Sequence, residues 1–273
     1  MKYCISGRQP KSVLEKTDEI KMRYSDKERM VEYMREWPEK TFILDVPKGT
    51  EIDFPWCATL ASENNLILCL GDLSLAKLCS DFGLAFYWSF PITSYYELHG
   101  VIDLKPAYIF LGAPLFFDLK MVTSITDIPV RLCPNLAFDA YVPREDGVYG
   151  TWIRPEDVAA YEKYVSTLEF VYRDLDHEKV LLHIYKENAT WPGNLNLLLT
   201  NFNVNVDNRA IADELAETRM NCGQRCMRSG TCHFCDTTVR FANAVRDKHY
   251  ENLKNAKKDE SHFIIEDRPE AEV

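Results

Sequence analysis

The chain has 273 residues, of which 46% are hydrophobic and 27% charged, and its formal net charge is −10. This composition is typical of a soluble globular protein and excludes a membrane span, since no apolar run approaches the ~18 residues that a spanning helix needs. The acidic balance argues against extensive duplex nucleic-acid binding, which requires a surplus of basic side chains. The N-terminal residues contain no export signal, so we expect the cytoplasm, where thiols stay reduced.

Short apolar runs alternate with helical patterns through the first two thirds of the chain. Several runs are continuously hydrophobic, as expected for strands that are buried on both faces of a parallel sheet. The expected strands lie at 2–6, 42–46, 66–70, 85–90, 107–111, 129–133, 150–154 and 167–172.

Helix start signals fall between these strands. Ser25 and Glu28 have the spacing of a capping box, and so do Ser94 and Glu97. Pro155 stands where the first helical residue is expected, and acidic residues follow it on the first turn. A further helix is expected over 176–189.

Strands that alternate with helices indicate βαβ units, and eight of them predict a (β/α)8 barrel over residues 1–190. A doubly wound open sheet is the alternative. Residues 191–257 are expected to form a helical region, with helices over 207–220 and 237–254. The polar and charged residues 258–273 are expected to form a mobile tail.

Four of the nine cysteines lie in the stretch NCGQRCMRSGTCHFC, at Cys222, Cys226, Cys232 and Cys235. Four thiolates on short loops can surround a zinc ion or hold a [4Fe–4S] cluster. A disulfide framework is disfavoured because the compartment is reducing and the number of cysteines is odd. The spacing C-x3-C-x5-C-x2-C matches neither a zinc ribbon nor the radical-SAM signature, so spacing alone leaves zinc and iron–sulfur open.

A series of short strands followed by four clustered cysteines resembles the collagenase-like peptidase family, which includes tRNA-uridine and oxygen-independent ubiquinone hydroxylation proteins. The resemblance covers the strand order, residues 131–135 (RLCPN) and residues 222–235. It implies a (β/α)8-type fold and a [4Fe–4S] cluster held by the four cysteines, and it leaves the substrate open. The cysteines of the family are more widely spread along the chain. Its Glu-Gly-Arg motif is absent here, and Leu168-Glu169-Phe170 echoes it only in part.

Candidate catalytic residues stand at the C-terminal ends of the expected strands, where (β/α)8 barrels carry their chemistry. Asp45 and Glu169 are carboxylates in otherwise apolar strands, and burial would move their pKa toward the range of general acid–base catalysis. Arg154 or Arg131 could pair with them, and Asn135 follows the sixth expected strand. The alternative is that Asp45 caps a strand end and that the arginines form ordinary ion pairs.

Two functions from different classes fit these features. The first is an iron–sulfur barrel enzyme, possessing an oxidoreductase or hydroxylase-like activity, that modifies a small molecule or a nucleic-acid base. The second is a non-catalytic protein that binds a partner and in which the four cysteines hold a structural zinc ion. A further, weaker hypothesis is nucleic-acid contact through the arginines of 219–240. The substrate, the partners and the oligomeric state do not follow from the sequence.

Overall fold

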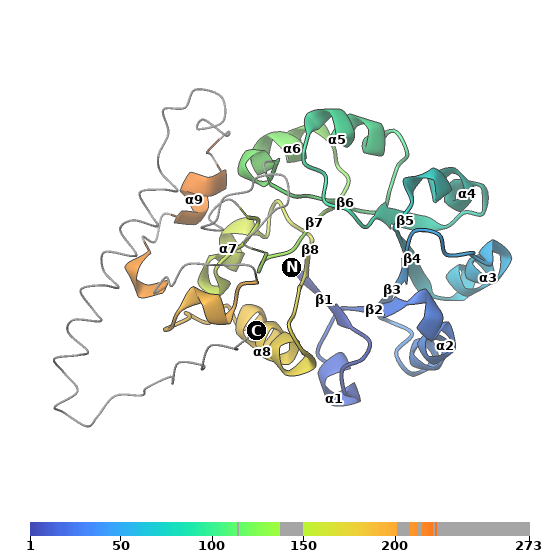
Figure 1. The fold of residues 1–273 in the computed structure, drawn as a ribbon, viewed down its shortest axis with the longest axis horizontal. Helices are drawn as coiled ribbons and strands as arrows, with labels where there is room; N and C mark the ends of the chain where they lie inside the picture. Colours follow the sequence, from blue (N-terminus) through green and yellow to red (C-terminus); the bar gives the residue numbers. More distant parts are fainter. Residues whose placement is uncertain (114, 137–149, 201–207, 212–214, 221, 223–273) are drawn as a thin grey trace, which may run out of the picture.

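Runs rich in β-branched, leucine and aromatic residues form eight parallel strands in the computed structural model of the chain (Figure 1). The structure describes residues 1–113, 115–136, 150–200, 208–211, 215–220 and 222. The strands are β1 Lys2–Ser6, β2 Glu19–Arg23, β3 Thr41–Val46, β4 Asn65–Leu70, β5 Ala85–Trp88, β6 Ile109–Phe110, β7 Val130–Leu132 and β8 Thr167–Glu169.

The strands form a nearly closed barrel. They are hydrogen-bonded in the order β5-β4-β3-β2-β1-β8-β7-β6, so the first strand lies beside the last. Between β5 and β6 the Ala107 N–H donates to the Phe86 carbonyl (2.7 Å), and Ile92 bridges to Leu111. Every strand lies beside its neighbours in sequence, which is the arrangement of a (β/α)8 barrel. The barrel expectation is therefore confirmed, and the doubly wound open sheet is wrong.

A helix follows each strand and packs on the outside of the barrel (Figure 1). These helices are α1 Lys11–Leu14, α2 Lys27–Glu36, α3 Phe54–Glu63, α4 Ala76–Asp81, α5 Tyr95–Ile102, α6 Leu119–Ile125, α7 Val158–Tyr161 and α8 Leu175–Lys186. Short 3-10 helices precede four of them: η1 Tyr24–Asp26, η2 Leu73–Leu75, η3 Leu115–Asp118 and η4 Pro155–Asp157. None of the helices in the described part of the chain has both the length and the apolar character to cross a bilayer.

Only one of the two expected capping boxes forms. The Glu97 N–H donates to Ser94 Oγ (3.2 Å), and the Ser94 N–H donates to Glu97 Oε2 (3.2 Å), so α5 begins as predicted. The box expected at Ser25 is wrong, because the chain there forms the 3-10 turn η1 and α2 begins after it without a side-chain cap. Pro155 is the first residue of η4, as expected.

Two differences separate the expected strands from the observed ones. No strand is expected at Glu19–Arg23, where the structure has β2, and the strand expected at 150–154 is wrong. In β2, charged residues alternate with Ile20 and Met22, so the strand lacks the continuous apolar run that marks its neighbours. Residues 150–154 are buried but extended outside the sheet, where the Ile153 N–H donates to the Pro134 carbonyl (2.7 Å).

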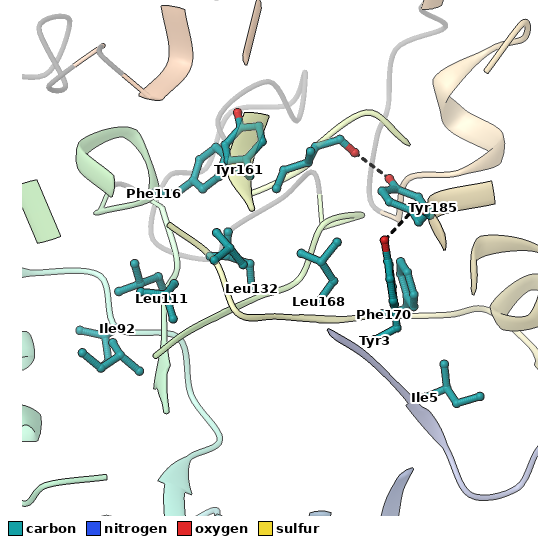
Figure 2. Packing of buried hydrophobic residues seen from close by; sticks show 14 of the residues in the cluster. Tyr3, Ile5, Ile92, Leu111, Phe116, Leu132, Tyr161, Leu168, Phe170 and Tyr185 are labelled. Carbon is teal, nitrogen blue, oxygen red and sulfur yellow. Dashed lines mark hydrogen bonds between the residues drawn. The ribbon is translucent and has the colours of Figure 1, made fainter. Parts of the chain in front are cut away.

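The outer core fills the space between the strands and the helices. Figure 2 shows Tyr3 of β1, Phe170 and Tyr185 of α8 packed together in this core. The Tyr3 ring stacks on Phe170 with 6.4 Å between centroids, and the Tyr3 hydroxyl donates to the Tyr185 carbonyl (3.0 Å). The Tyr185 hydroxyl in turn donates to the Ile153 carbonyl (2.7 Å). These contacts hold α8 against the point where the first and last strands meet.

A second, smaller cluster fills the inside of the barrel. It contains side chains that point away from the helices and come from the strands or from the residues next to them: Cys4, Ile43, Cys69, Tyr87, Tyr108, Phe110 and Cys133. Because successive side chains of a strand point to opposite faces, the outer and inner cores alternate along each strand.

The described residues after α8 pack on the loops that follow β6 and β7. They include η5 Leu195–Leu197, η6 Asn208–Ala210 and α9 Leu215–Met220. The Thr200 N–H donates to the Asn135 carbonyl (2.8 Å), and the Arg219 guanidinium lies 4.2 Å from the centroid of Trp152. The helix expected over 207–220 is thus seen only in the parts η6 and α9. The helix expected over 237–254 and the tail 258–273 lie outside the described residues, so the division at residues 190 and 257 stays a prediction.

Candidate active site

Strand β2 supplies two of the charged side chains inside the barrel, Glu19 and Lys21. Ile20 and Met22 are buried in the outer core, so the alternation of the strand turns Glu19, Lys21 and Arg23 toward the interior. Glu19 is fully buried. A carboxylate at this depth requires a cationic partner and hydrogen-bond donors.

Arg131 of β7 is that partner. Its Nη1 donates to Glu19 Oε2 (2.8 Å), and its Nε donates to Glu169 Oε2 on β8 (2.7 Å). The Arg131 side chain is 0% exposed, and that of Glu169 is 14% exposed. One guanidinium thus joins carboxylates from β2 and β8 across the interior. Of the two arginines that the sequence suggests as partners of Glu169, it is Arg131 that forms the ion pair.

Two tyrosines flank the Arg131 guanidinium. Its Cζ lies 4.8 Å from the ring centroid of Tyr87 and 5.0 Å from that of Tyr108, within the range of cation–π attraction. The Tyr108 hydroxyl donates to Glu19 Oε1 (2.7 Å), and the Tyr87 hydroxyl donates to Glu169 Oε2 (3.2 Å). Burial raises the pKa of both phenols, so they remain donors at neutral pH.

Lys21 extends the network toward the open end of the barrel. Its Nζ lies 2.6 Å from Glu169 Oε1 and 3.9 Å from Asp45 Oδ1. Burial by itself lowers the pKa of Lys21, but the Glu169 and Asp45 carboxylates outweigh it and raise that pKa well above the ordinary lysine range. Burial raises the pKa of Glu169, yet Lys21 and Arg131 lower it overall, to about 2. Lys21 and Glu169 are therefore both charged at neutral pH.

A cavity of about 220 Å³ lies above this network, at the C-terminal ends of β1, β2, β3 and β8. Cys4, Lys21, Asp45 and Glu169 contribute to its lining. Gly7, at the end of β1, also lines it, and a Cβ there would lie 2.5 Å from Met22 Cγ. The absence of a side chain at this position lets the end of β1 approach β2 closely.

Glu178 of α8 fixes the end of β1 beside the cavity. Its carboxylate accepts hydrogen bonds from the Ser6 N–H (2.7 Å) and from Gln9 Nε2 (2.7 Å). Burial raises the pKa of Glu178. With both oxygens engaged by the β1 loop, this carboxylate holds the cavity wall.

The barrel thiols are buried beside the charged network. Burial raises the pKa of Cys69 to about 12 and also raises the pKa of Cys4 and Cys133. Cys133, which follows β7, is therefore a neutral thiol at physiological pH, and a thiol is a weak nucleophile.

The four catalytic candidates from the sequence fall into two groups. Asp45 and Glu169 both line the cavity and lie close to Lys21. Asn135 instead pairs its side-chain amide with the backbone of Val171, whose N–H donates to Asn135 Oδ1 (3.0 Å). It joins the loops after β7 and β8.

Arg154 also lies away from the cavity lining. Its guanidinium forms a two-fold ion pair with Asp157, with Nε–Oδ2 at 2.6 Å and Nη2–Oδ1 at 2.8 Å. Arg154 directly precedes η4, and its ion pair with Asp157 supports the start of that 3-10 helix. Because Arg154 does not line the cavity and is paired with Asp157, the structure does not favour the catalytic role predicted for it.

Lys21 and Glu19 are not among the site residues expected from the sequence, because no strand is expected at Glu19–Arg23. The available signal was the alternation in Glu19-Ile-Lys-Met-Arg, where three charged residues share one face of a strand. In a barrel, a charged face can point inward as well as outward.

Of the predicted metal ligands, only Cys222 lies within the described residues. It is half-buried, follows α9 and packs against the outer core. Cys226, Cys232 and Cys235 lie outside the described residues. Within the described part, no group of three or more histidine, cysteine or carboxylate side chains is placed to hold a metal ion.

Comparison with known proteins yields fold resemblance only. No family model and no curated protein matches the chain. One similar solved structure is a designed cube-shaped, highly porous protein cage, with 9% identity, a TM-score of 0.44, and coverage of 96% of this chain and 93% of that chain. Another is 3-keto-L-gulonate-6-phosphate decarboxylase from Vibrio cholerae, with 9% identity, a TM-score of 0.40, and coverage of 68% and 94%.

A third similar structure is thiamine phosphate pyrophosphorylase from Pyrococcus furiosus, with 15% identity, a TM-score of 0.32, and coverage of 68% and 93%. Likeness at this level carries no information on activity. The barrel assignment rests on the strand order of the chain itself.

Proposed function

We propose that the chain is a (β/α)8 enzyme that modifies a small molecule or a nucleic-acid base at the C-terminal mouth of its barrel. The observation that carries this proposal is the placement of Lys21 between Glu169 and Asp45 in the lining of the mouth cavity. Enzymes of this fold carry their active sites at the same end of the barrel. The volume of about 220 Å³ lies below the ~300–1,000 Å³ of sites for drug-sized ligands, which favours a small substrate.

Lys21 would stabilise negative charge that develops on a substrate oxygen. Its raised pKa keeps the ammonium protonated, so this lysine is suited to electrostatic stabilisation and unsuited to attack as a free amine. Glu169 is held ionised by Lys21 and Arg131 and would position the ammonium.

Asp45 is the proton acceptor in this proposal. It is only partly buried, lines the cavity, and lies 3.9 Å from Lys21, its single partner among the ion pairs of the described residues. A carboxylate and an ammonium facing one cavity suit proton abstraction next to a carbonyl group, where Asp45 takes the proton and Lys21 stabilises the resulting oxyanion.

We further propose that Cys222, Cys226, Cys232 and Cys235 hold a [4Fe–4S] cluster, with zinc as the alternative. Four thiols suit either group chemically, and the resemblance to the collagenase-like peptidase family favours the cluster. When bound, such a cluster supplies electron transfer. Cys222 follows α9, and Arg219 of α9 donates to the carbonyls of Gly150 and Trp152 in the loop after β7. This anchor lies on the same side of the barrel as the mouth.

A metabolite-consumption experiment tests the catalytic proposal. The purified protein is incubated with a small-molecule extract of cells, with and without oxygen, and consumed compounds are identified by mass spectrometry. Compounds consumed by the wild type should persist with Asp45→Asn and Lys21→Met, whereas Lys48→Gln, an exposed change after β3, should behave as the wild type. Circular dichroism establishes that each variant is folded. Equal consumption by Asp45→Asn and the wild type would refute the proposed site.

Metal analysis of protein prepared without oxygen tests the cofactor. About four iron atoms and four sulfides per chain, with broad visible absorption that Cys226→Ser and Cys232→Ser remove, would support the cluster. One zinc ion per chain, whose removal unfolds the chain, together with no consumed compound, would favour the non-catalytic, partner-binding alternative.

A further inference from the structure

We infer that the substrate of the mouth cavity carries an oxyanion group, either phosphate or carboxylate, that binds Arg23 and Arg29 at the rim with Arg8 beside them. This inference deepens the proposed function and rests on it. The inference rests on a difference between the charged side chains that line the cavity: most of the carboxylates are paired, whereas Arg23 and Arg29 form no ion pair with a described residue.

The anionic side chains of the lining are largely engaged. Four carboxylates and four cationic groups contribute to the cavity, so its formal charge is balanced. Glu169 is bonded to Lys21 and Arg131, and Glu178 accepts hydrogen bonds from the β1 loop. Asp26 lies 3.9 Å from Arg8, which is itself 54% exposed.

The arginines of the rim are not engaged to the same degree. Arg23 forms no side-chain hydrogen bond or ion pair with any residue in the described part of the chain, and it is exposed in the cavity lining. Arg29 directs Nε to the hydroxyl of Tyr33 (2.9 Å), which is a neutral acceptor. No described carboxylate lies within ion-pair distance of either guanidinium. The guanidinium groups of Arg23 and Arg29 are therefore available to bind an anion, although the whole chain is acidic.

The position of Arg23 suits binding of one end of a small molecule. It lies two residues beyond Lys21 on the same face of β2, which is a rise of about 7 Å toward the open end. An anion at the rim would thus leave the rest of a short substrate near Lys21 and Asp45. Guanidinium groups present parallel N–H donors that match the oxygens of phosphate and carboxylate.

Nuclear magnetic resonance of ¹⁵N-labelled protein tests this inference without knowledge of the substrate. Inorganic phosphate and acetate are titrated separately while the amide signals of the β1 and β2 ends and the arginine Nε–H signals are followed. Phosphate, acetate or both should shift these signals in the wild type. Arg23→Gln and Arg29→Gln should each weaken that binding about tenfold or more, because each removes charge-assisted hydrogen bonds.

Arg35→Gln is the matched control, because Arg35 lies on the same helix as Arg29, is exposed and does not line the cavity. It should change the affinity less than twofold. Tighter binding of phosphate assigns a phosphate group, and tighter binding of acetate assigns a carboxylate. The inference is overturned if neither anion shifts the mouth signals, or if Arg35→Gln weakens binding as much as Arg29→Gln.

The outcomes separate this inference from the proposed function. Anion binding that depends on Arg23, together with no consumed compound, would leave the anion site in place and refute the enzyme. Consumption of an uncharged compound that depends on Asp45, together with no anion binding, would refute the anion site and leave the enzyme.

Discussion

Lys21 Nζ lies 2.6 Å from Glu169 Oε1, although the strands that carry them, β2 and β8, are separated by β1. The intervening strand places only Cys4 and Ser6 between them, with Cys4 in register with Glu169 and Ser6 in register with Lys21. Both are small side chains, so the ammonium and the carboxylate can meet in front of β1. The contact joins the strands on either side of β1 at the floor of the mouth cavity.

The depressed pKa of Glu169 predicts a loss of stability in acid. Its folded-state pKa of about 2 lies below the ordinary value of 4.5, so the unfolded chain takes up this proton first as the pH falls. The stabilisation, about 3 kcal/mol, is fully present above about pH 5 and is lost as the pH falls toward 2. Roughly 2 kcal/mol of it should be lost by pH 3. Urea unfolding followed by circular dichroism from pH 7 to pH 3 measures the decrease.

The variant Glu169→Gln isolates this contribution. It should be less stable than the wild type by about 3 kcal/mol at pH 7 and should show a shallower dependence on pH below 5. Glu63→Gln, an exposed change on α3, should keep the wild-type dependence. Parallel acid profiles for Glu169→Gln and the wild type would contradict an ionised Glu169 in the folded protein.

Removal of Arg131 should be strongly destabilising. Arg131→Met leaves the carboxylates of Glu19 and Glu169 in the barrel without their shared cation, a change that typically lowers the free energy of unfolding by ~3–5 kcal/mol. Urea unfolding at pH 7 measures the effect.

Arg131→Lys separates charge from geometry. A lysine keeps the charge but cannot donate to both carboxylates while lying between Tyr87 and Tyr108, so it should recover less than half of the lost stability. Full recovery by lysine would show that charge alone matters here. Arg35→Gln on the exposed face of α2 should change stability by less than about 0.5 kcal/mol.

The sequence predicts the barrel well where strands are apolar on both faces. β3 and β4 are buried between the inner and outer cores and appear as nearly unbroken hydrophobic runs, Phe-Ile-Leu in one and Leu-Ile-Leu in the other. β2 is not apolar on both faces, because its inner face carries Glu19 and Lys21, which form ion pairs with residues of β7 and β8. A charged inner face depends on partners more than 100 residues away, and local patterning contains no sign of them.

The candidate site divides in the same way. Asp45 and Glu169 are recognisable because a carboxylate in an apolar strand requires a partner. Asn135 follows β7, whereas Arg154 ends a segment that forms no strand. Asn135 binds loop backbone and Arg154 binds Asp157, and both contacts depend on how the loops after β7 and β8 fold. The position of a residue after an expected strand therefore predicts at which end of the barrel the residue lies. It does not predict whether the side chain faces the cavity.

The cap of α5 offers a stability test of the two predicted capping boxes. Ser94→Ala removes the acceptor of the Glu97 N–H and should lower the free energy of unfolding by about 1 kcal/mol. Ser25→Ala should be nearly neutral, because Ser25 does not cap α2 in the structure. Urea unfolding of both variants at pH 7 measures the difference. An equal loss for the two serines would contradict the observed start of α2.

Two glycines should respond to alanine in opposite directions. A Cβ at Gly71, after β4, would lie 2.5 Å from the Lys48 backbone nitrogen and 3.0 Å from the Pro47 carbonyl carbon. Backbone atoms cannot turn aside as a side chain can, so Gly71→Ala should lower the free energy of unfolding by roughly 1–3 kcal/mol.

Gly100 lies within α5, and a Cβ there meets no atom of the described residues within 4 Å. Gly100→Ala should therefore stabilise the protein by up to about 1 kcal/mol, because alanine loses less conformational entropy than glycine when a helix forms. Thermal unfolding of the two variants against the wild type measures both shifts. A lower midpoint for Gly100→Ala would show that this face of α5 is covered, and an unchanged midpoint for Gly71→Ala would show that the loops after β3 and β4 can move apart.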